Sequence, residues 1–268
     1  MGDAEFERDG SLVTVVLDGQ PQSAVDLDDP ERLDFEYVQH LALCLDALAP
    51  GGPLRVTHVG GAGLTLARWL HHTRPGSPQV VLEPDAALTE AVRRELPLPR
   101  GHRIRVRPVD GLTGVVALGD ASADVVVVDA YAGGRVPPEL ATVEWFAEVG
   151  RVVGPRGLVL ANLADEPGLR YAARVAAGAR VALGHVAVVG LHEVLKAKRF
   201  GNLVLVGSRA PLDLWTLRRA TASAALPTGV LSSDDIARRR PGARPFSTRK
   251  GDTASSPEPP TRGAWRRS

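Results

Sequence analysis

The sequence has one cysteine, no long apolar run and no signal-peptide core, and each absence narrows the class of protein. Cys44 has no second cysteine to pair with, so an internal disulfide is impossible, which is typical of the reducing cytoplasm. Runs such as Val125–Val128 have the length of a strand and fall short of the roughly 20 residues of a membrane-spanning helix. Residues 1–7 are acidic and lack an apolar stretch. We therefore expect a soluble, cytoplasmic protein without a membrane segment.

Several catalytic motifs are also absent from the sequence. It contains no Walker phosphate loop and no Gly-x-Ser-x-Gly nucleophile elbow. His71 and His72 have no acid or cysteine at metal-ligand spacing, so we expect no metal site. Cys44 lies within an apolar pattern, which predicts packing in the core rather than a nucleophile.

The formal net charge of +1 conceals a basic C-terminus. From Ala237 onward the chain has nine Lys or Arg against two acids. This stretch is rich in Pro, Ser, Thr and Gly and lacks apolar periodicity, which predicts a disordered tail over residues 227–268. Such tails can bind nucleic acid weakly through phosphates, but a dispensable solvated extension is the commoner case.

An N-terminal subdomain is predicted over residues 1–50. Leu12–Leu17 has the β-branched content of a strand, and Asp18-Gly19 is a turn signal, so the two predict a β-hairpin. Asp29-Pro30 is typical of a helix start, and apolar residues then recur at helical spacing as far as Ala49.

Residues 51–226 alternate apolar strand candidates with helical segments. This alternation predicts a doubly wound α/β domain of the Rossmann type, because strands that are apolar on both faces need helices on both sides. The predicted strands are 55–59, 80–83, 104–108, 125–129, 157–162, 185–191 and 202–207, and the predicted helices are 64–72, 86–95, 138–153 and 169–182.

The most informative motif is a glycine turn that follows the first of these strands. Gly60, Gly61 and Gly63 leave room for a ligand to approach the backbone. Glu83 ends the next strand about twenty residues later, which is the arrangement in which an acid accepts hydrogen bonds from ribose hydroxyls. The pattern predicts a nucleoside-binding site; the alternative is an ordinary tight turn followed by a solvated acid.

Other polar residues also stand where predicted strands end. In an open parallel sheet, ligands bind at the carboxyl ends of the strands. Because these ends share one edge, we expect the residues there to form one site. They are Gly60–Gly63, Glu83, Asp110, Asp129 and Asn162.

Taken in order, these motifs resemble the spermidine synthase (polyamine aminopropyltransferase) family, in particular its divergent spermidine synthase-like members. The resemblance runs from Leu12 to Ser208. Leu17–Ser23 is similar to the family's N-terminal hairpin signature, and Asp124–Asp129 to the strand that leads into its catalytic loop. Glu36 and His40 fit the first helix of the family pattern.

The resemblance implies a methyltransferase-like fold with a small N-terminal β-hairpin subdomain. It also implies transfer of an aminopropyl group from decarboxylated S-adenosylmethionine to a polyamine or other amine, with Asp129 as the proton acceptor. Tyr131 would orient the amine or line the pocket, and we expect a homodimer. The implied cofactor-binding residues are Gln22, the glycines Gly60, Gly61 and Gly63, Glu83 at the ribose, and Asp110 and Gly111 at the adenine.

The chain departs from the family pattern at groups that contact the amines. Ala62 and Ala132 replace two acids, Ala130-Tyr131 replaces a Ser-Ser pair, and Asp34-Phe35 stands for a Tyr-His pair. Two other functions therefore stay open. One is methyl transfer from S-adenosylmethionine; the other is a non-catalytic protein that binds an adenosyl ligand.

Overall fold

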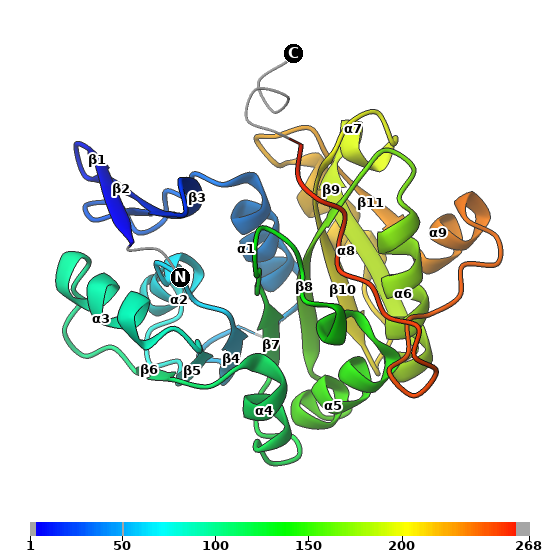
Figure 1. Ribbon diagram of the computed structural model, residues 1–268, viewed down its shortest axis with the longest axis horizontal. Coiled ribbons are helices and arrows are strands. Elements are labelled where there is room, and N and C mark those ends of the chain that lie inside the picture. The colour runs from blue at the N-terminus through cyan, green and yellow to red at the C-terminus, as the bar shows by residue number, and fades with distance from the viewer. Residues whose placement is uncertain (1–3, 50, 261–268) are drawn as a thin grey trace.

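The structure, a computed structural model, describes residues 4–49 and 51–260 and contains two sheets. The small sheet is antiparallel and holds β1 (Glu5–Asp9), β2 (Leu12–Leu17) and β3 (Gln20–Asp26) in that order. Asp18 and Gly19 both have positive φ and make the turn between β2 and β3, as the sequence predicts. Figure 1 shows the small sheet at one end of the molecule, above α2 and α3.

The large sheet has eight strands in the order β11-β9-β10-β8-β7-β4-β5-β6. Its parallel part holds β4 (Val56–Val59), β5 (Gln79–Leu82), β6 (Ile104–Arg107), β7 (Val125–Val128) and β8 (Leu158–Asp165). The antiparallel part holds β9 (His185–Leu191), β10 (Gly201–Ser208) and β11 (Thr228–Ser232).

Helices cover both faces of the large sheet, which confirms the doubly wound prediction (Figure 1). The four valines of β7 are all buried: Val125 and Val127 pack toward one face, and Val126 and Val128 toward the other. This explains the unbroken apolar run. The first face carries α1 (Glu36–Leu48), α2 (Thr65–Thr73) and α8 (Leu214–Ala222); the second carries α4 (Gly111–Val116), α5 (Val143–Val153) and α6 (Arg170–Leu183).

The predicted helix over 138–153 is two elements rather than one. A short 3₁₀ helix, η1 (Pro138–Ala141), precedes α5, and Thr142 separates them because its hydroxyl accepts a hydrogen bond from the Trp145 N–H at 3.2 Å. The other helices are α3 (Ala86–Glu95), α7 (His192–Leu195) and α9 (Ser233–Arg239). Within 4–49 and 51–260, no helix is long and apolar enough to cross a membrane.

Helix α1 packs against the large sheet, whereas the sequence groups it with the β-hairpin in a subdomain over residues 1–50. Leu41 and Leu45 of this helix are fully buried and share an apolar cluster with Leu160 of β8. The helix also begins later than predicted, at Glu36, because the Asp29 carboxylate closes a turn by accepting from the Glu31 N–H at 3.0 Å.

The predicted disorder from residue 227 is wrong as far as residue 260. Strand β11 pairs with β9, and the Ser232 and Asp235 side chains form a reciprocal capping box at the start of α9. Leu231 and Phe246 are buried in the main core. A few apolar anchors and many side chain–backbone bonds order this basic segment, and composition does not reveal them. The rest of the predicted tail, residues 261–268, lies outside the described residues.

Candidate active site

The glycine loop and Glu83 meet at the carboxyl edge of the parallel strands. The Gly60 N–H donates to the Leu82 carbonyl at 2.9 Å, so the loop continues the pairing of β4 with β5. The Gly61 N–H then donates to Glu83 Oε2 at 3.1 Å, and Glu83 Oε1 accepts from the Asp85 N–H at 3.0 Å. The partly exposed carboxylate is therefore held beside the loop in a fixed orientation.

Gly60 also brings the loop against the end of β7. Its φ is +86°, in the left-handed region, and a Cβ on Gly60 would lie 2.2 Å from the carbonyl oxygen of Asp129. A side chain is excluded there by both conformation and space. The glycine loop and Asp129 are consequently neighbours.

The small sheet closes over the other end of this loop through Ser23 rather than Gln22. A Cβ on Gly63 would lie 2.4 Å from Ser23 Oγ, which hydrogen bonds to Thr65 Oγ1 at 2.8 Å. Thr65 in turn donates to the Ala24 carbonyl at 2.9 Å. The Gln22 amide donates to its own turn, to the Gln20 carbonyl at 3.4 Å, so its contact with a ligand remains a prediction.

A buried arginine links the glycine loop to the residues that follow α3. Arg68 donates to the Gly63 carbonyl at 3.2 Å, to the Pro97 carbonyl at 3.2 Å and to the Leu96 carbonyl. Burial lowers the pKa of Arg68 to about 10, which leaves the guanidinium charged at neutral pH. The Arg68 guanidinium therefore holds the Gly63 carbonyl in place by a hydrogen bond from its side chain.

Asp110 and Gly111 lie where β6 leads into α4. Asp110 Oδ1 accepts from the Thr113 N–H at 2.9 Å, and this bond to the helix N-terminus lowers the pKa of the exposed Asp110 carboxyl. A Cβ on Gly111 would lie 2.3 Å from Val59 Cγ1, so glycine lets α4 approach β4. The helix cap accounts for Asp110 structurally; its contact with adenine stays a prediction.

Asp129 is the centre of a hydrogen-bonded group of neutral side chains. Asn162 Nδ2 donates to Asp129 Oδ1 at 2.9 Å, and the Tyr37 hydroxyl of α1 donates to the same carboxylate. Burial raises the pKa of Asp129, while these two hydrogen bonds act in the opposite direction. The sequence rule that places Asp129 and Asn162 at one edge is confirmed, but Tyr37 was not predicted.

The group extends from Asp129 to a third strand and a second tyrosine. Asn202 Nδ2 of β10 donates to Asn162 Oδ1 at 3.0 Å and lies 3.4 Å from the Tyr131 hydroxyl. Burial and the nearby Asp129 carboxylate raise the pKa of Tyr131, so its hydroxyl stays protonated. Tyr37 and Asn162 thus bond directly to the Asp129 carboxylate, and Asn202 and Tyr131 are linked to it through Asn162.

Glu36 and His40 on α1 occupy different surroundings. Glu36 Oε2 lies 3.7 Å from Arg199 Nη2, and Arg199 Nε lies 3.5 Å from Glu193. Burial raises the pKa of Glu36, and Arg199 opposes that shift. His40 is buried, with Nε2 3.0 Å from Thr228 Oγ1, and burial lowers its pKa to about 4. His40 is therefore a neutral link to β11.

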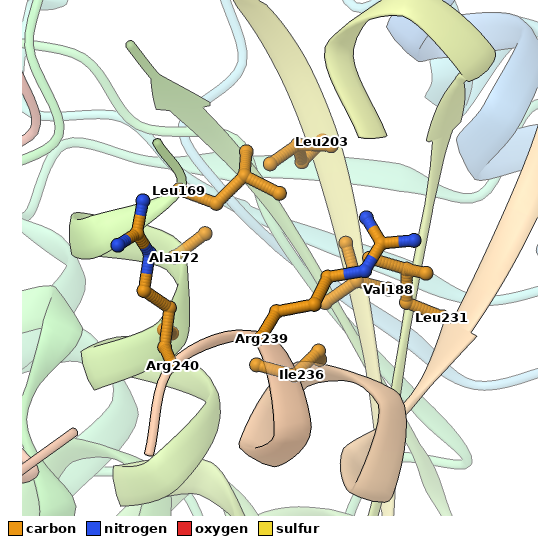
Figure 2. Close-up of a pocket in the computed structure, with 9 residues that line it drawn as sticks. Leu169, Ala172, Val188, Leu203, Leu231, Ile236, Arg239 and Arg240 are labelled. Atoms are coloured by element: carbon orange, nitrogen blue, oxygen red, sulfur yellow. The ribbon is translucent and has the colours of Figure 1, made fainter. Parts of the chain in front are cut away.

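A small pocket, drawn in Figure 2, is lined by none of the site residues described above. It lies between α6, α9 and the antiparallel strands, and its walls are mostly apolar. Arg239 and Arg240 flank it and donate to the Leu195 and Gly168 carbonyls. Its lining includes neither the glycine loop nor Asp129, so it is separate from the candidate site.

The carboxyl of Asp165, at the end of β8, should make stability depend on pH. It is fully buried, and burial raises its pKa to about 6 although the Ala172 and Glu166 N–H groups donate to it. Because the pKa is higher in the folded state, protonation of Asp165 adds to the free energy of unfolding. This contribution is fully present below about pH 4 and is lost as the pH rises through 6.

We expect Asp165→Asn to remove most of this pH dependence. At about 1.4 kcal/mol per pKa unit, the free energy of unfolding of the variant should fall by about 2–3 kcal/mol less than that of the wild type between pH 4 and 7. The lost carboxylate bond adds a cost that does not depend on pH. Urea unfolding of both proteins at the two pH values measures this; parallel pH profiles would contradict it.

Comparisons with known proteins agree with this geometry. No family model matches the chain. It is 25% identical over 164 residues to the polyamine aminopropyltransferase of Chromobacterium violaceum, a match that spans 60% of this chain and 62% of that protein. The crystal structure of a probable spermidine synthase from Corynebacterium glutamicum superposes with a TM-score of 0.83 and 30% identity, over 96% of this chain and 95% of that one. The chain belongs to the spermidine synthase family.

The fold of this family member is shared more widely. Human methyltransferase-like protein 13, whose structure contains SAH, superposes with a TM-score of 0.56 and 20% identity, over 71% of this chain and 94% of that one. At 20% identity, this likeness shows the fold alone. The predictions of fold and family from the sequence are thus confirmed.

Proposed function

We propose that the protein transfers an aminopropyl group from decarboxylated S-adenosylmethionine to an amine. The observation that carries the proposal is the position of Asp129: its backbone contacts Gly60 of the glycine loop, and Tyr37 and Asn162 hold its carboxylate. A proton acceptor therefore adjoins the loop expected to bind the adenosyl group. The homology to aminopropyltransferases supports the same reaction.

The reaction is a displacement at carbon. The acceptor nitrogen forms a bond to the methylene carbon next to the sulfonium, and the carbon–sulfur electron pair passes to sulfur, which leaves as methylthioadenosine. The nitrogen loses a proton, and Asp129 accepts it. An amine must be neutral to attack, and it therefore needs a nearby proton acceptor. The Asp129 carboxylate, whose pKa is raised by burial, can accept the proton and also align the amine. Tyr131 would line the acceptor side.

Amine recognition must differ from the family pattern. A charge-assisted hydrogen bond contributes about 1.5–3 kcal/mol, and the replacements at Ala62 and Ala132 remove two such partners. Tyr37 and Tyr131 are two aromatic side chains close to Asp129, and an aromatic ring attracts an ammonium; Glu36 adds a carboxylate that Arg199 partly neutralises. We infer an acceptor that relies less on ionic contacts than the family's usual polyamine.

Methyl transfer is a second candidate, and Ala62 is the observation that favours it. Without an acid at this position, the site would not repel the carboxylate of S-adenosylmethionine. Calorimetry with S-adenosylmethionine, its decarboxylated form and methylthioadenosine separates the two functions. We expect the decarboxylated form and methylthioadenosine to bind more tightly; tighter binding of S-adenosylmethionine would favour methyl transfer.

Glu83→Ala should weaken adenosyl-ligand binding at least tenfold, or about 1.4 kcal/mol, because the ribose hydroxyls lose their acceptor. Calorimetry with methylthioadenosine measures the change. Glu83→Gln keeps an acceptor oxygen and should lose less, and Glu90→Ala, at an exposed site on α3, is the control. Unchanged affinity in folded Glu83→Ala would remove the ribose assignment.

We propose a homodimer and a cytoplasmic location. Weak binding of nucleic acid through the basic C-terminus is less favoured, since several of its arginines have partners within the protein: Arg238 pairs with Asp235, and Arg239 and Arg240 bond to carbonyls.

A further inference from the structure

The segment from Pro245 to Pro260, which we name the C-terminal arm, runs back over α5 and α6 (red in Figure 1). Its first part is strongly anchored. The Phe246 ring is buried between the Arg174 guanidinium, 3.9 Å from the ring centre, and Tyr171, and the Val143 N–H donates to the Phe246 carbonyl at 3.0 Å.

A carboxylate of α5 adds a second anchor. Glu144 accepts from Ser247 Oγ at 2.7 Å and from the Thr248 N–H at 3.1 Å. Desolvation acts to raise the pKa of Glu144, but these hydrogen bonds and others nearby outweigh it and lower the pKa to about 2. The carboxylate is therefore ionised, and the anchor intact, throughout the pH range of an activity assay.

The far part of the arm reaches the loop that follows Asp129. Ser256 is 0% exposed; its Oγ accepts from the Val136 N–H at 2.9 Å and its carbonyl accepts from Arg135 Nε at 2.6 Å. A Cβ on Gly134 would lie 3.4 Å from Pro259. The arm thus hydrogen bonds to two consecutive residues of this loop and lies close to a third.

The loop itself contains little that would keep it in one conformation. Gly133 and Gly134 both have positive φ, and two backbone hydrogen bonds join Ala132 and Arg135 across the turn, at 2.9 and 3.2 Å. Tyr131 stands at the start of this turn, with its hydroxyl near Asn202. Glycines give the chain many alternatives, so contacts from outside must select one.

We propose that the C-terminal arm is a latch for this loop and that Ser256 is a positioning residue, which acts through Val136 and Arg135 to fix Tyr131 on the acceptor side of Asp129. The inference rests on the proposed function for its catalytic part. Removing Ser256 Oγ leaves the N–H of Val136, a residue that is 1% exposed, without its acceptor, and an unsatisfied buried donor favours an opened loop.

Ser256→Ala tests the latch, with Ser255→Ala at a partly exposed neighbouring site as the matched control. A chain ending after Asp252 keeps the Phe246 and Glu144 anchors but removes the contacts to the loop. Amide hydrogen exchange of residues 131–136 reports on the loop whether or not the protein turns over. We expect exchange at least tenfold faster in Ser256→Ala and in the shortened chain, and wild-type exchange in Ser255→Ala.

Kinetics then test the positioning role. With decarboxylated S-adenosylmethionine and an amine, kcat/KM for the amine should fall about 5–50-fold in Ser256→Ala, while the Kd for methylthioadenosine should change less than twofold. Unchanged loop exchange in both variants would overturn the latch. Faster exchange with unchanged kcat/KM would overturn the positioning role. If the wild type transfers nothing, the proposed function and the positioning role both fail, and the exchange data still decide whether the arm holds the loop.

Discussion

Asp129→Asn is expected to leave adenosyl-ligand binding intact and to slow aminopropyl transfer by roughly 10²–10⁴-fold. Asn has nearly the size of Asp and keeps one oxygen to accept from Asn162, so the hydrogen-bonded group can survive. It cannot take a proton from the attacking amine. Because the Gly60 contact involves the main chain at Asp129, the glycine loop should keep its shape.

Asp124→Asn is the matched control for this prediction. Asp124 immediately precedes β7, at the opposite end of the strand from Asp129, and pairs with Arg55 at 2.6 Å. Its loss should cost some stability but leave transfer nearly unchanged. Methylthioadenosine release measures transfer in the three proteins, and calorimetry measures binding. Near wild-type release by Asp129→Asn would remove Asp129 from the mechanism.

Gly60→Ala should have the second largest effect. A positive φ costs an alanine about 1–2 kcal/mol, and a Cβ placed 2.2 Å from the Asp129 carbonyl oxygen adds overpacking of about 1–3 kcal/mol. The atoms that the Cβ would meet belong to the main chain of Asp129, which moves less easily than the end of a flexible side chain. We therefore expect losses in the free energy of unfolding and of methylthioadenosine binding that together reach about 2–4 kcal/mol.

Gly52→Ala isolates the conformational part of this cost. Gly52 has nearly the same φ, +85°, and nothing within 4 Å of its added Cβ. Urea unfolding and calorimetry on both variants should therefore show a clear excess loss for Gly60→Ala. Equal losses in the two variants would show that the contact between the loop and Asp129 is not tight.

Much of the parallel half of the fold follows from local sequence patterns. Parallel strands end at one edge, so the rule that places Gly61 near Glu83, and Asp129 near Asn162, needs only strand limits and the sheet type. These placements are confirmed, while the ligand-binding roles of the residues stay predictions. Tyr37 was missed because its helical spacing resembles that of a core residue, and its hydroxyl reaches Asp129 only through tertiary packing.

The segment from residue 227 onward was harder to predict for a physical reason. Leu231, Phe246 and Ser256 are widely separated anchors in a polar, basic sequence, and each is stabilised by partners distant in the sequence. Hydrophobic periodicity detects a continuous apolar face but does not detect single contacts of this kind. Asn202 was missed for a similar reason: it lies near the start of β10, and its hydrogen bond to Asn162 depends on which strand lies beside β10.

The most direct measurement is methylthioadenosine release by the wild-type protein supplied with decarboxylated S-adenosylmethionine and a panel of diamines, longer polyamines and less charged amines. Calorimetry first confirms that the co-substrate binds. We expect release with at least one amine, together with the aminopropylated product, and loss of that release in Asp129→Asn. Binding of the co-substrate without release for any amine would contradict aminopropyl transfer and leave an adenosyl-binding protein without this activity.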